Sequence, residues 1–168
     1  MAPWLIITPA NRLVFLFIGG DLLGYVFAKN DEISLIMPDW HEGEEELFEI
    51  VLNDTLEVVG DLYYYNEVDK VSGNVEYSVF EEYRGFGYAK KALILFAENI
   101  FKRDKVDLFI SILPDNIASI KTAKNAGAVF ERMVSIPRKY KFSKDGKYNM
   151  ALMFKIENNS KEKTIEKK

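Results

Sequence analysis

Alternating apolar and polar residues mark strands in the middle of the chain. Leu47 to Leu52, a polar turn at Asn53 to Thr55 and then Leu56 to Tyr65 have the pattern of a hairpin. Gly73-Asn74 is a turn signal in front of a further strand-like run, Val75 to Phe80. These runs predict an antiparallel meander.

The periodicity changes after this meander. Apolar residues then recur at helical spacing, with charged residues on the other faces: Ala89, Ala92, Leu93, Phe96 and Ile100. A wholly apolar strand, Val106 to Leu113, follows the helix and completes a strand–helix–strand crossover.

A second helix and two closing strands complete the C-terminal half. Asp115 or Asn116 is expected to cap the helix, and Gly127 is expected to end it. Ala128 to Ile136 and Tyr148 to Ile156 have strand patterns, with the turn signal Asp145-Gly146 between them.

The first forty residues have weaker boundaries. Leu5 to Ile7 has strand character, and Thr8-Pro9 predicts the start of a helix that runs to about Ile18. After Gly19-Gly20, Asp21 is expected to cap a second helical stretch from Leu22 to about Lys29, before an irregular acidic region at 38–46. The apolar run from Leu13 to Ile18 is too short to span a membrane.

The composition then limits the chemistry. A chain of 168 residues with 48% hydrophobic residues predicts one globular domain, residues 1–157, followed by a charged, disordered tail at 158–168. The net charge of −4 argues against binding of nucleic acid through its phosphates. The chain has no Cys and only His41, which lies in a loop-like stretch, so we expect no metal site and no Ser-His-Asp triad.

A glycine loop lies between the strand at 75–80 and the helix that follows. Arg84-Gly85-Phe86-Gly87-Tyr88-Ala89 can turn backbone N–H groups toward an anion at a helix N-terminus. Two glycines at this spacing are weak evidence by themselves, because they also suit a tight strand-to-helix turn.

Two longer motifs resemble those of the GNAT N-acetyltransferases, in the version found in the group that acetylates ribosomal-protein N-termini. Residues 75–93, VEYSVFEEYRGFGYAKKAL, resemble the coenzyme A motif of that superfamily. Residues 116–128, NIASIKTAKNAGA, are similar to its second signature. The resemblance covers roughly Leu47 to Ile156.

This resemblance implies an α/β (α+β) fold of known type. It consists of a mixed, mostly antiparallel sheet with a central splayed parallel strand pair and helices on both faces. The resemblance also implies a cytoplasmic enzyme that uses acetyl-CoA, with no metal, to acetylate a primary amine by direct attack in a ternary complex.

The cofactor-binding residues carried over from the motifs form three sets. Backbone groups of Ser78, Val79 and Phe80 would pair with the pantetheine amides. Asn116 and Ser119 would lie near the thiol, and Lys124 would approach the adenosine phosphates. Each side chain also has an ordinary role open to it, as a helix cap, a first-turn hydroxyl or a solvated lysine. The pyrophosphate would be held by the N–H groups of Arg84, Gly85, Phe86, Gly87, Tyr88, Ala89 and Lys90.

The catalytic assignment rests on fewer residues. Glu76 is the first candidate for a general base, although it equally suits the solvent side of a strand. The family often has a Tyr where this chain has Ala123, so Ser119 is the best substitute donor to the thiol, followed by Tyr140 and Tyr148.

The acceptor is left open by the sequence. A run of glutamates between 42 and 49 would attract a cationic amine such as a polyamine, an aminoglycoside or a protein N-terminus, but also suits a solvated face. Other possibilities are a non-catalytic acyl-CoA-binding module and a nucleotide-binding protein that shares only the loop. No membrane partner is expected, and the chain would act as a monomer or a homodimer.

Overall fold

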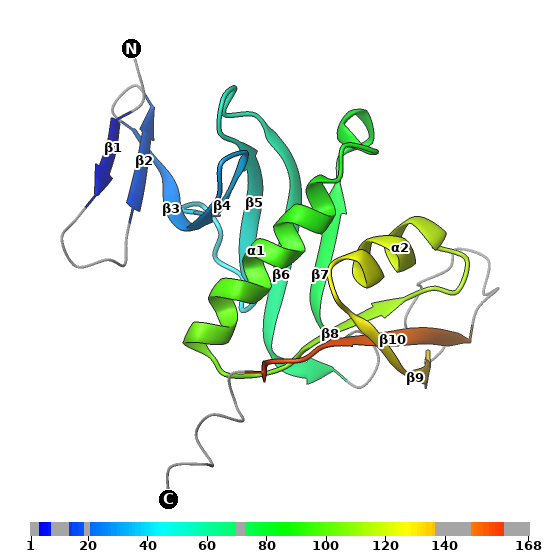
Figure 1. Ribbon diagram of the computed structural model, residues 1–168. Coiled ribbons are helices and arrows are strands. Elements are labelled where there is room, and N and C mark those ends of the chain that lie inside the picture. Colours follow the sequence, from blue (N-terminus) through cyan, green and yellow to red (C-terminus); the bar gives the residue numbers. More distant parts are fainter. Residues whose placement is uncertain (1–3, 8–13, 19–20, 70–72, 137–148, 160–168) are drawn as a thin grey trace, which may run out of the picture.

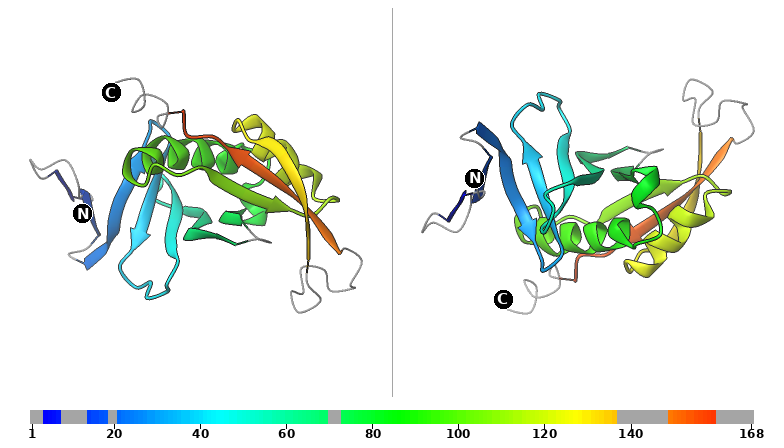
Figure 2. Two further views of the ribbon diagram at one scale, coloured as in Figure 1. Left: turned by 90° about the horizontal axis from the view of Figure 1, so that it is seen from below. Right: turned by 90° about the horizontal axis from the view of Figure 1, so that it is seen from above.

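A single ten-stranded sheet organises the chain (Figure 1). The computed structural model describes residues 4–7, 14–18, 21–69, 73–136 and 149–159. The strand order across the sheet is β1-β2-β3-β4-β5-β6-β7-β8-β10-β9. Figure 2 shows β1 and β2 at one edge of this sheet and β9 at the other. The strands are β1 (Trp4–Ile7), β2 (Val14–Ile18), β3 (Asp21–Lys29), β4 (Ile33–Pro38), β5 (Glu46–Leu52), β6 (Val58–Asp69), β7 (Gly73–Val79), β8 (Leu108–Ile112), β9 (Val129–Ser135) and β10 (Met150–Ile156).

The expected meander and both expected C-terminal helices are present. β5, β6 and β7 pair antiparallel, with Phe48 opposite Leu62 and Leu62 opposite Tyr77. The short helix η1 (Glu81–Tyr83) and the glycine loop lead from β7 into α1 (Tyr88–Arg103), and α2 (Ile117–Asn125) follows β8. The expected α+β fold with a mostly antiparallel sheet is therefore confirmed.

The core lies between the sheet and α1. The predicted helix positions Ala92, Leu93, Phe96 and Ile100 are all fully buried, and α1 packs against β3, β4, β6 and β7. α2 packs against β8 and α1, and its Ala123 joins the same core cluster. Both helices lie in front of the sheet in Figure 1, whereas helices on both faces were expected. Both described helices lie on the same side because their apolar residues belong to one buried cluster, which includes Phe96 of α1 and Ala123 of α2.

The N-terminal prediction of two helices is wrong, because β2 and β3 occupy those segments and β4 is an additional strand. Runs rich in β-branched and aromatic residues, such as Val14 to Ile18, suit paired strands better than a helix. Gly24, with φ +153°, lies so close to β4 that an added Cβ would be 2.3 Å from the Met37 carbonyl oxygen. Pairing with β4 outweighed the local capping signals here.

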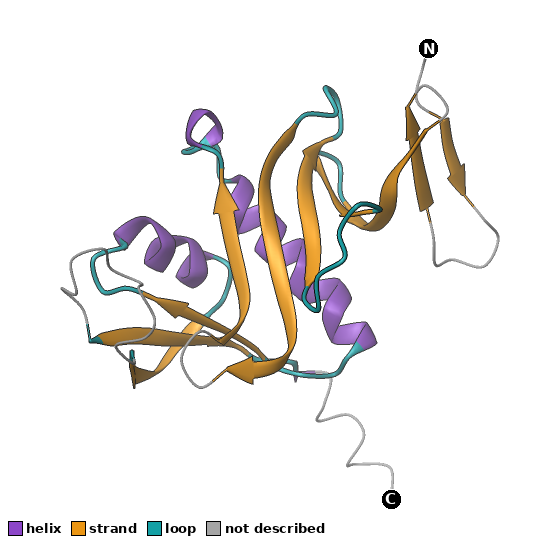
Figure 3. Ribbon diagram, turned by 180° about the vertical axis from the view of Figure 1, so that it is seen from behind, coloured by secondary structure: helices purple, strands orange, loops and turns teal. Residues whose placement is uncertain are grey.

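The expected parallel strand pair is not confirmed. β7 and β8 pair at one position only, Gly73 opposite Ile110, and the pairing is antiparallel. The buried Asn74 side chain fixes this point, because its Oδ1 accepts a bond of 2.7 Å from the Phe109 N–H. From there the two strands run apart, as Figures 1 and 3 show. The edge of β7 beyond Asn74 therefore has no ladder with β8.

The folded part extends slightly further than the sequence predicted. Asn158, which was assigned to the tail, is only 2% exposed. Its backbone N–H donates to Asp107 and its side chain donates to the Phe101 carbonyl. Residues 160–168 lie outside the described part of the chain. Among the residues that are described, no helix is long and apolar enough to cross a membrane.

Candidate active site

The glycine loop presents an uncapped helix N-terminus. Gly85 and Gly87 both have left-handed backbones, with φ +87° and +82°, and a Cβ added at either would meet no atom within 4 Å. Gly87 is the N-cap of α1 and offers no side chain to the first turn. In the described part of the chain, the N–H groups of Gly85 to Lys90 have no bonded acceptor. Such a cluster of free N–H groups, at the positive end of a helix dipole, is suited to an anion.

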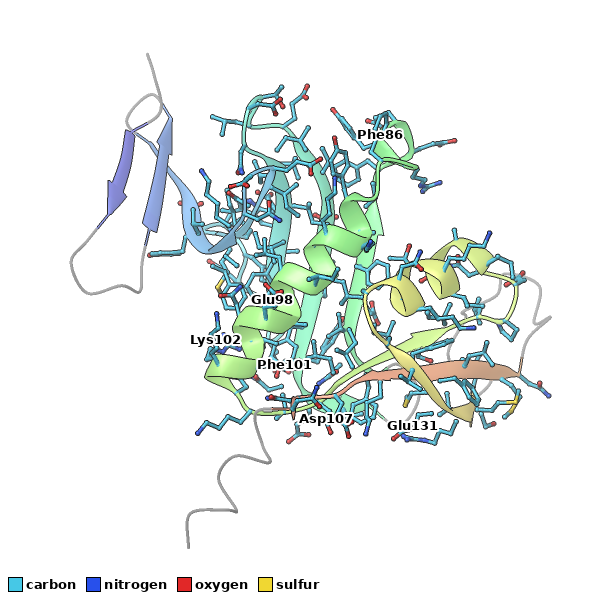
Figure 4. The ribbon with its side chains drawn as sticks, viewed as in Figure 1. Phe86, Glu98, Phe101, Lys102, Asp107 and Glu131 are labelled. Carbon is cyan, nitrogen blue, oxygen red and sulfur yellow. The ribbon has the colours of Figure 1, made fainter. Side chains whose placement is uncertain are left out.

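The side chains around this loop have distinct positions. The Arg84 Nε donates to the Val79 carbonyl at 3.1 Å, so its side chain turns back toward β7. Lys91 is paired with Glu32, with Nζ 2.7 Å from Oε1. Lys90 and Phe86 are exposed, and Figure 4 shows Phe86 at the loop, away from the body of the sheet.

The open edge of β7 carries fewer of the expected pantetheine contacts than the motif implied. Both backbone groups of Phe80 are already used, because its N–H donates to Val59 and its carbonyl accepts from Tyr83. The Ser78 carbonyl faces β6, since an added Cβ at Gly60 would lie 2.2 Å from it. Backbone groups alternate between the two edges of a strand. The groups directed toward β8 therefore belong to Tyr77 and, among the three expected residues, to Val79. The Val79 carbonyl is already occupied by Arg84, which leaves the Val79 N–H.

The second motif brings Ser119 against β7. Asn116 caps α2, because its Oδ1 accepts a bond of 3.1 Å from the Ser119 N–H. The Ser119 Oγ is 3.0 Å from the Tyr77 Oη, which also donates to the Ser119 carbonyl at 3.2 Å. Burial raises the pKa of the Tyr77 phenol above its usual value, so it keeps its proton at neutral pH. Lys124 is exposed in the last turn, at the other end of α2.

Sequence reasoning missed Tyr77. Its ring packs against the core shared by α1 and α2, and its hydroxyl contacts a residue 42 positions later. The strand alternation that directed attention to Glu76 also implies that the next side chain points to the opposite face. Strand alternation therefore predicted the face of the sheet toward which the Tyr77 side chain points, but it gave no indication that Tyr77 contacts Ser119.

The face opposite α1 gathers carboxylates around Glu76. Glu76 is exposed and lies opposite Tyr63 on β6, while Asp61 lies opposite both Glu49 and Ser78. Burial raises the pKa of Glu49, and the neighbouring Asp61 carboxylate raises it further. Burial also raises the pKa of Asp61. The face is thus rich in negative charge that is partly withdrawn from solvent.

Aromatic side chains and one loop border this acidic face. Burial, followed by the charges of Glu76 and Glu45, raises the pKa of Tyr65. His41 lies in the connection between β4 and β5, as expected, and its Nε2 is 3.0 Å from the Glu45 carbonyl oxygen. Tyr64, by contrast, points into the core and is 1% exposed.

Two of the proposed donors, Tyr140 and Tyr148, lie outside the described residues. Asn149 is described and exposed, and its carbonyl accepts from the Ile136 N–H. Within the described ranges, no group of three or more His, Asp or Glu residues is arranged to hold a metal ion.

Several solved structures that resemble the chain are acetyltransferases. One, from Vibrio cholerae, is named as a ribosomal-protein-serine acetyltransferase; it has 24% identity and a TM-score of 0.51, over 67% of this chain and 64% of that one. A spermidine/spermine N-acetyltransferase from the same organism has 15% identity and a TM-score of 0.57, over 74% and 71%. A microcin C7 self-immunity acetyltransferase, solved with acetyl-CoA and AMP, has 14% identity and a TM-score of 0.59, over 76% and 93%.

These likenesses establish the fold, and the sequence establishes the family. The chain spans slightly less than two thirds of the ribosomal-protein-serine acetyltransferase. No curated protein sequence matches it. The model of the acetyltransferase (GNAT) domain, however, matches residues 25–129, well over half of the chain. The chain therefore belongs to the GNAT acetyltransferase family.

Proposed function

We propose that this protein is an acetyl-CoA-dependent N-acetyltransferase that acetylates a primary amine by direct attack in a ternary complex. The observation that carries the proposal is the set of free N–H groups from Gly85 to Lys90, which match the pyrophosphate of coenzyme A. The family match over residues 25–129 supports this choice of anion over a nucleotide.

The rest of the donor would follow the open edge of β7. The Val79 N–H and the backbone groups of Tyr77 are free of a β8 ladder and would pair with the pantetheine amides, whereas the Val79 carbonyl already accepts from Arg84. Asn116 and Ser119 would then lie beside the thiol end, at the first turn of α2. Lys90 and Lys124 are exposed cations that would approach the phosphates. Residues of this chain would thereby bind and orient the donor mainly through backbone groups.

The acceptor amine would arrive on the acidic face. Attack requires a neutral nitrogen, and an α-amino group has a pKa of about 7.7–8.0, so a weak base is sufficient to remove its proton. Glu76 and Asp61 lie on this face as candidate bases, and burial raises the pKa of Asp61, which makes its carboxylate a stronger proton acceptor than an ordinary aspartate. With no Cys in the chain to carry an acetyl group, direct attack is the simpler route.

The same charges favour a cationic acceptor. The proteins of similar fold are named for a ribosomal protein and for spermidine, both amine-bearing acceptors. Carboxylates at Glu45, Glu49, Asp61 and Glu76 would attract such a cation to this face. A cytoplasmic location is part of this proposal, in keeping with a chain that has no Cys.

A non-catalytic acyl-CoA-binding module is the second candidate. It is favoured by Ala123, which stands where the family often has a tyrosine that protonates the departing thiolate, and which is fully buried. Such a module would bind coenzyme A as firmly as the enzyme but would not release it from acetyl-CoA.

Two measurements separate these functions. CoA and acetyl-CoA should raise the melting temperature, because a ligand that binds only the folded state stabilises it; a rise with ATP or NAD alone would contradict the family-based proposal. Thiol release from acetyl-CoA should then occur with at least one acceptor among peptides with free N-termini, polyamines and aminoglycosides. Firm CoA binding without any thiol release would favour the binding module.

A further inference from the structure

A phenol on β7 is hydrogen-bonded to the one hydroxyl that the second motif places at the first turn of α2. The Tyr77 Oη lies within hydrogen-bonding distance of both the Oγ and the carbonyl oxygen of Ser119, at 3.0 and 3.2 Å. The Ser119 N–H is bound by Asn116. Three atoms of Ser119 thus lie within hydrogen-bonding distance of two side chains, which is more than a helix cap requires.

We propose that Tyr77 is a positioning residue that orients the Ser119 hydroxyl for hydrogen bonding to the sulfur of coenzyme A. The inference rests on the proposed function, since it assumes that the thiol end lies beside Ser119. The single hydrogen of the Tyr77 hydroxyl can be donated to the Ser119 carbonyl oxygen or to the Ser119 Oγ. When it is donated to the Oγ, the hydroxyl hydrogen of Ser119 is left for another acceptor.

The phenol is suited to this role by its surroundings. The Tyr77 ring packs against the buried core, which includes Ala123, so the hydroxyl is fixed at the end of a rigid side chain. Burial raises its pKa, so it remains a donor over the whole neutral range. Tyr77 on β7 would thus place a phenol near the thiol in a chain that has Ala123 on α2 where the family often has a tyrosine.

In the transfer step Ser119 needs to donate a hydrogen bond to the departing sulfur, and it does not need to give up its proton. In the transfer step the amine nitrogen forms a bond to the thioester carbonyl carbon, and the carbon–sulfur bond breaks with its electron pair on sulfur. The amine proton goes to a carboxylate or water on the acidic face. A thiol has a pKa of about 8.5, and a serine hydroxyl is far less acidic, so Ser119 would stabilise the departing thiolate without ionising. The first turn of α2 adds the positive end of its helix dipole.

The test uses free coenzyme A, so it does not depend on knowing the acceptor. The thiolate fraction of CoA bound to the full chain is measured by ultraviolet absorbance as a function of pH, for the wild type, Tyr77→Phe, Ser119→Ala and the double variant. A hydrogen bond to a charged group corresponds to roughly a tenfold or larger change in the ratio of thiolate to thiol. We expect the wild type to have the lowest thiol pKa.

Three comparisons show whether Tyr77 acts through Ser119. Tyr77→Phe should lose at least part of the effect, and the double variant should match Ser119→Ala, because a residue that acts only through another adds nothing once that other is removed. Ser119→Thr, which keeps a hydroxyl, should recover part of the wild-type value. Tyr77→Leu also lacks the hydroxyl and replaces Tyr77→Phe if the latter does not fold.

A matched control is available on the neighbouring strand. Tyr64 is a buried tyrosine whose hydroxyl is bonded to Asp104, so Tyr64→Phe removes a comparable hydrogen bond away from the loop and α2. It should leave the thiol pKa unchanged. If Tyr77→Phe binds CoA with the wild-type thiol pKa, the role of Tyr77 is refuted while the proposed function stands. If the wild type does not bind CoA, the proposed function fails and this inference fails with it.

Discussion

The left-handed backbone of Gly87 provides a sharp test of the loop, because the chain contains a second glycine with nearly the same geometry. Gly87 has φ +82° and Gly127 has φ +94°, and an added Cβ would meet no atom within 4 Å at either position. An alanine in this conformation costs roughly 1–2 kcal/mol. Both Gly87→Ala and Gly127→Ala introduce this strain without a steric clash.

The two positions differ in how firmly the backbone is held. The Gly127 N–H donates to the Lys124 carbonyl, and the next N–H, of Ala128, donates to Ala123. Gly127→Ala therefore cannot relax, and its full cost should appear as lower stability, with a fall in melting temperature of about 2–8 °C. The Gly87 carbonyl accepts from the Lys91 N–H, but in the described structure the Gly87 N–H has no bonded acceptor, so on the loop side Gly87→Ala can relax when no ligand is bound.

The relaxed Gly87→Ala loop must return to the left-handed conformation to direct its N–H groups at the pyrophosphate. The cost then appears in binding, and about 1–2 kcal/mol corresponds to about 5- to 30-fold weaker CoA binding. Calorimetric titration with CoA and thermal unfolding measure the two quantities separately. We expect weaker binding with little loss of stability for Gly87→Ala, and the reverse for Gly127→Ala. Equal CoA affinity in the two variants would refute this use of the loop.

Three further predictions concern the loop, the divergence point and the acidic face. Gly87→Glu should abolish CoA binding, because it brings a carboxylate to the proposed phosphate site; titration of the folded variant with CoA checks this. Asn74→Ala should lower the free energy of unfolding by roughly 1–3 kcal/mol in chemical denaturation, since it leaves the Phe109 N–H without its acceptor. Asp61→Asn should raise the free energy of unfolding at pH 7, because burial raises the pKa of Asp61 in the folded state and its charged form therefore destabilises the fold. As the pH falls toward 3.8, Asp61 becomes protonated and this destabilisation is lost. Denaturant unfolding of both proteins should therefore show the advantage of the variant at pH 7 disappearing near pH 4.

Local signals in the sequence were sufficient for the C-terminal half of the fold. Asn116 and Gly127 bound α2 as expected, because a cap and a left-handed terminus act within a few residues of the helix ends. The apolar spacing from Ala92 to Ile100 similarly identified the buried side of α1. The N-terminal strands were missed, because β2 and β3 depend on pairing with neighbouring strands, which outweighed the helix signals of Thr8-Pro9 and Asp21.

Contacts across the sequence account for what else was missed at the site. Asn74 binds the backbone of Phe109 across 35 positions, and Tyr77 reaches Ser119 across 42. No regular spacing in the sequence identifies either pair, because which residues meet depends on how β7 and β8 diverge around α1. The motif likewise named Phe80 as a pantetheine contact, but both of its backbone groups are engaged within the fold.

Strand alternation explains how one short strand can serve both reactants of the proposed transfer. Glu76 and Tyr77 are adjacent, so their side chains lie on opposite faces of β7. Glu76 shares its face with Asp61 and Glu49, where a cation is favoured, while Tyr77 lies with Ser119 at the positive end of α2. An anionic donor would be repelled from the first face and stabilised at the loop and helix ends. The charge distribution would therefore keep the donor and the acceptor apart except at the open edge of β7, where the amine must meet the thioester.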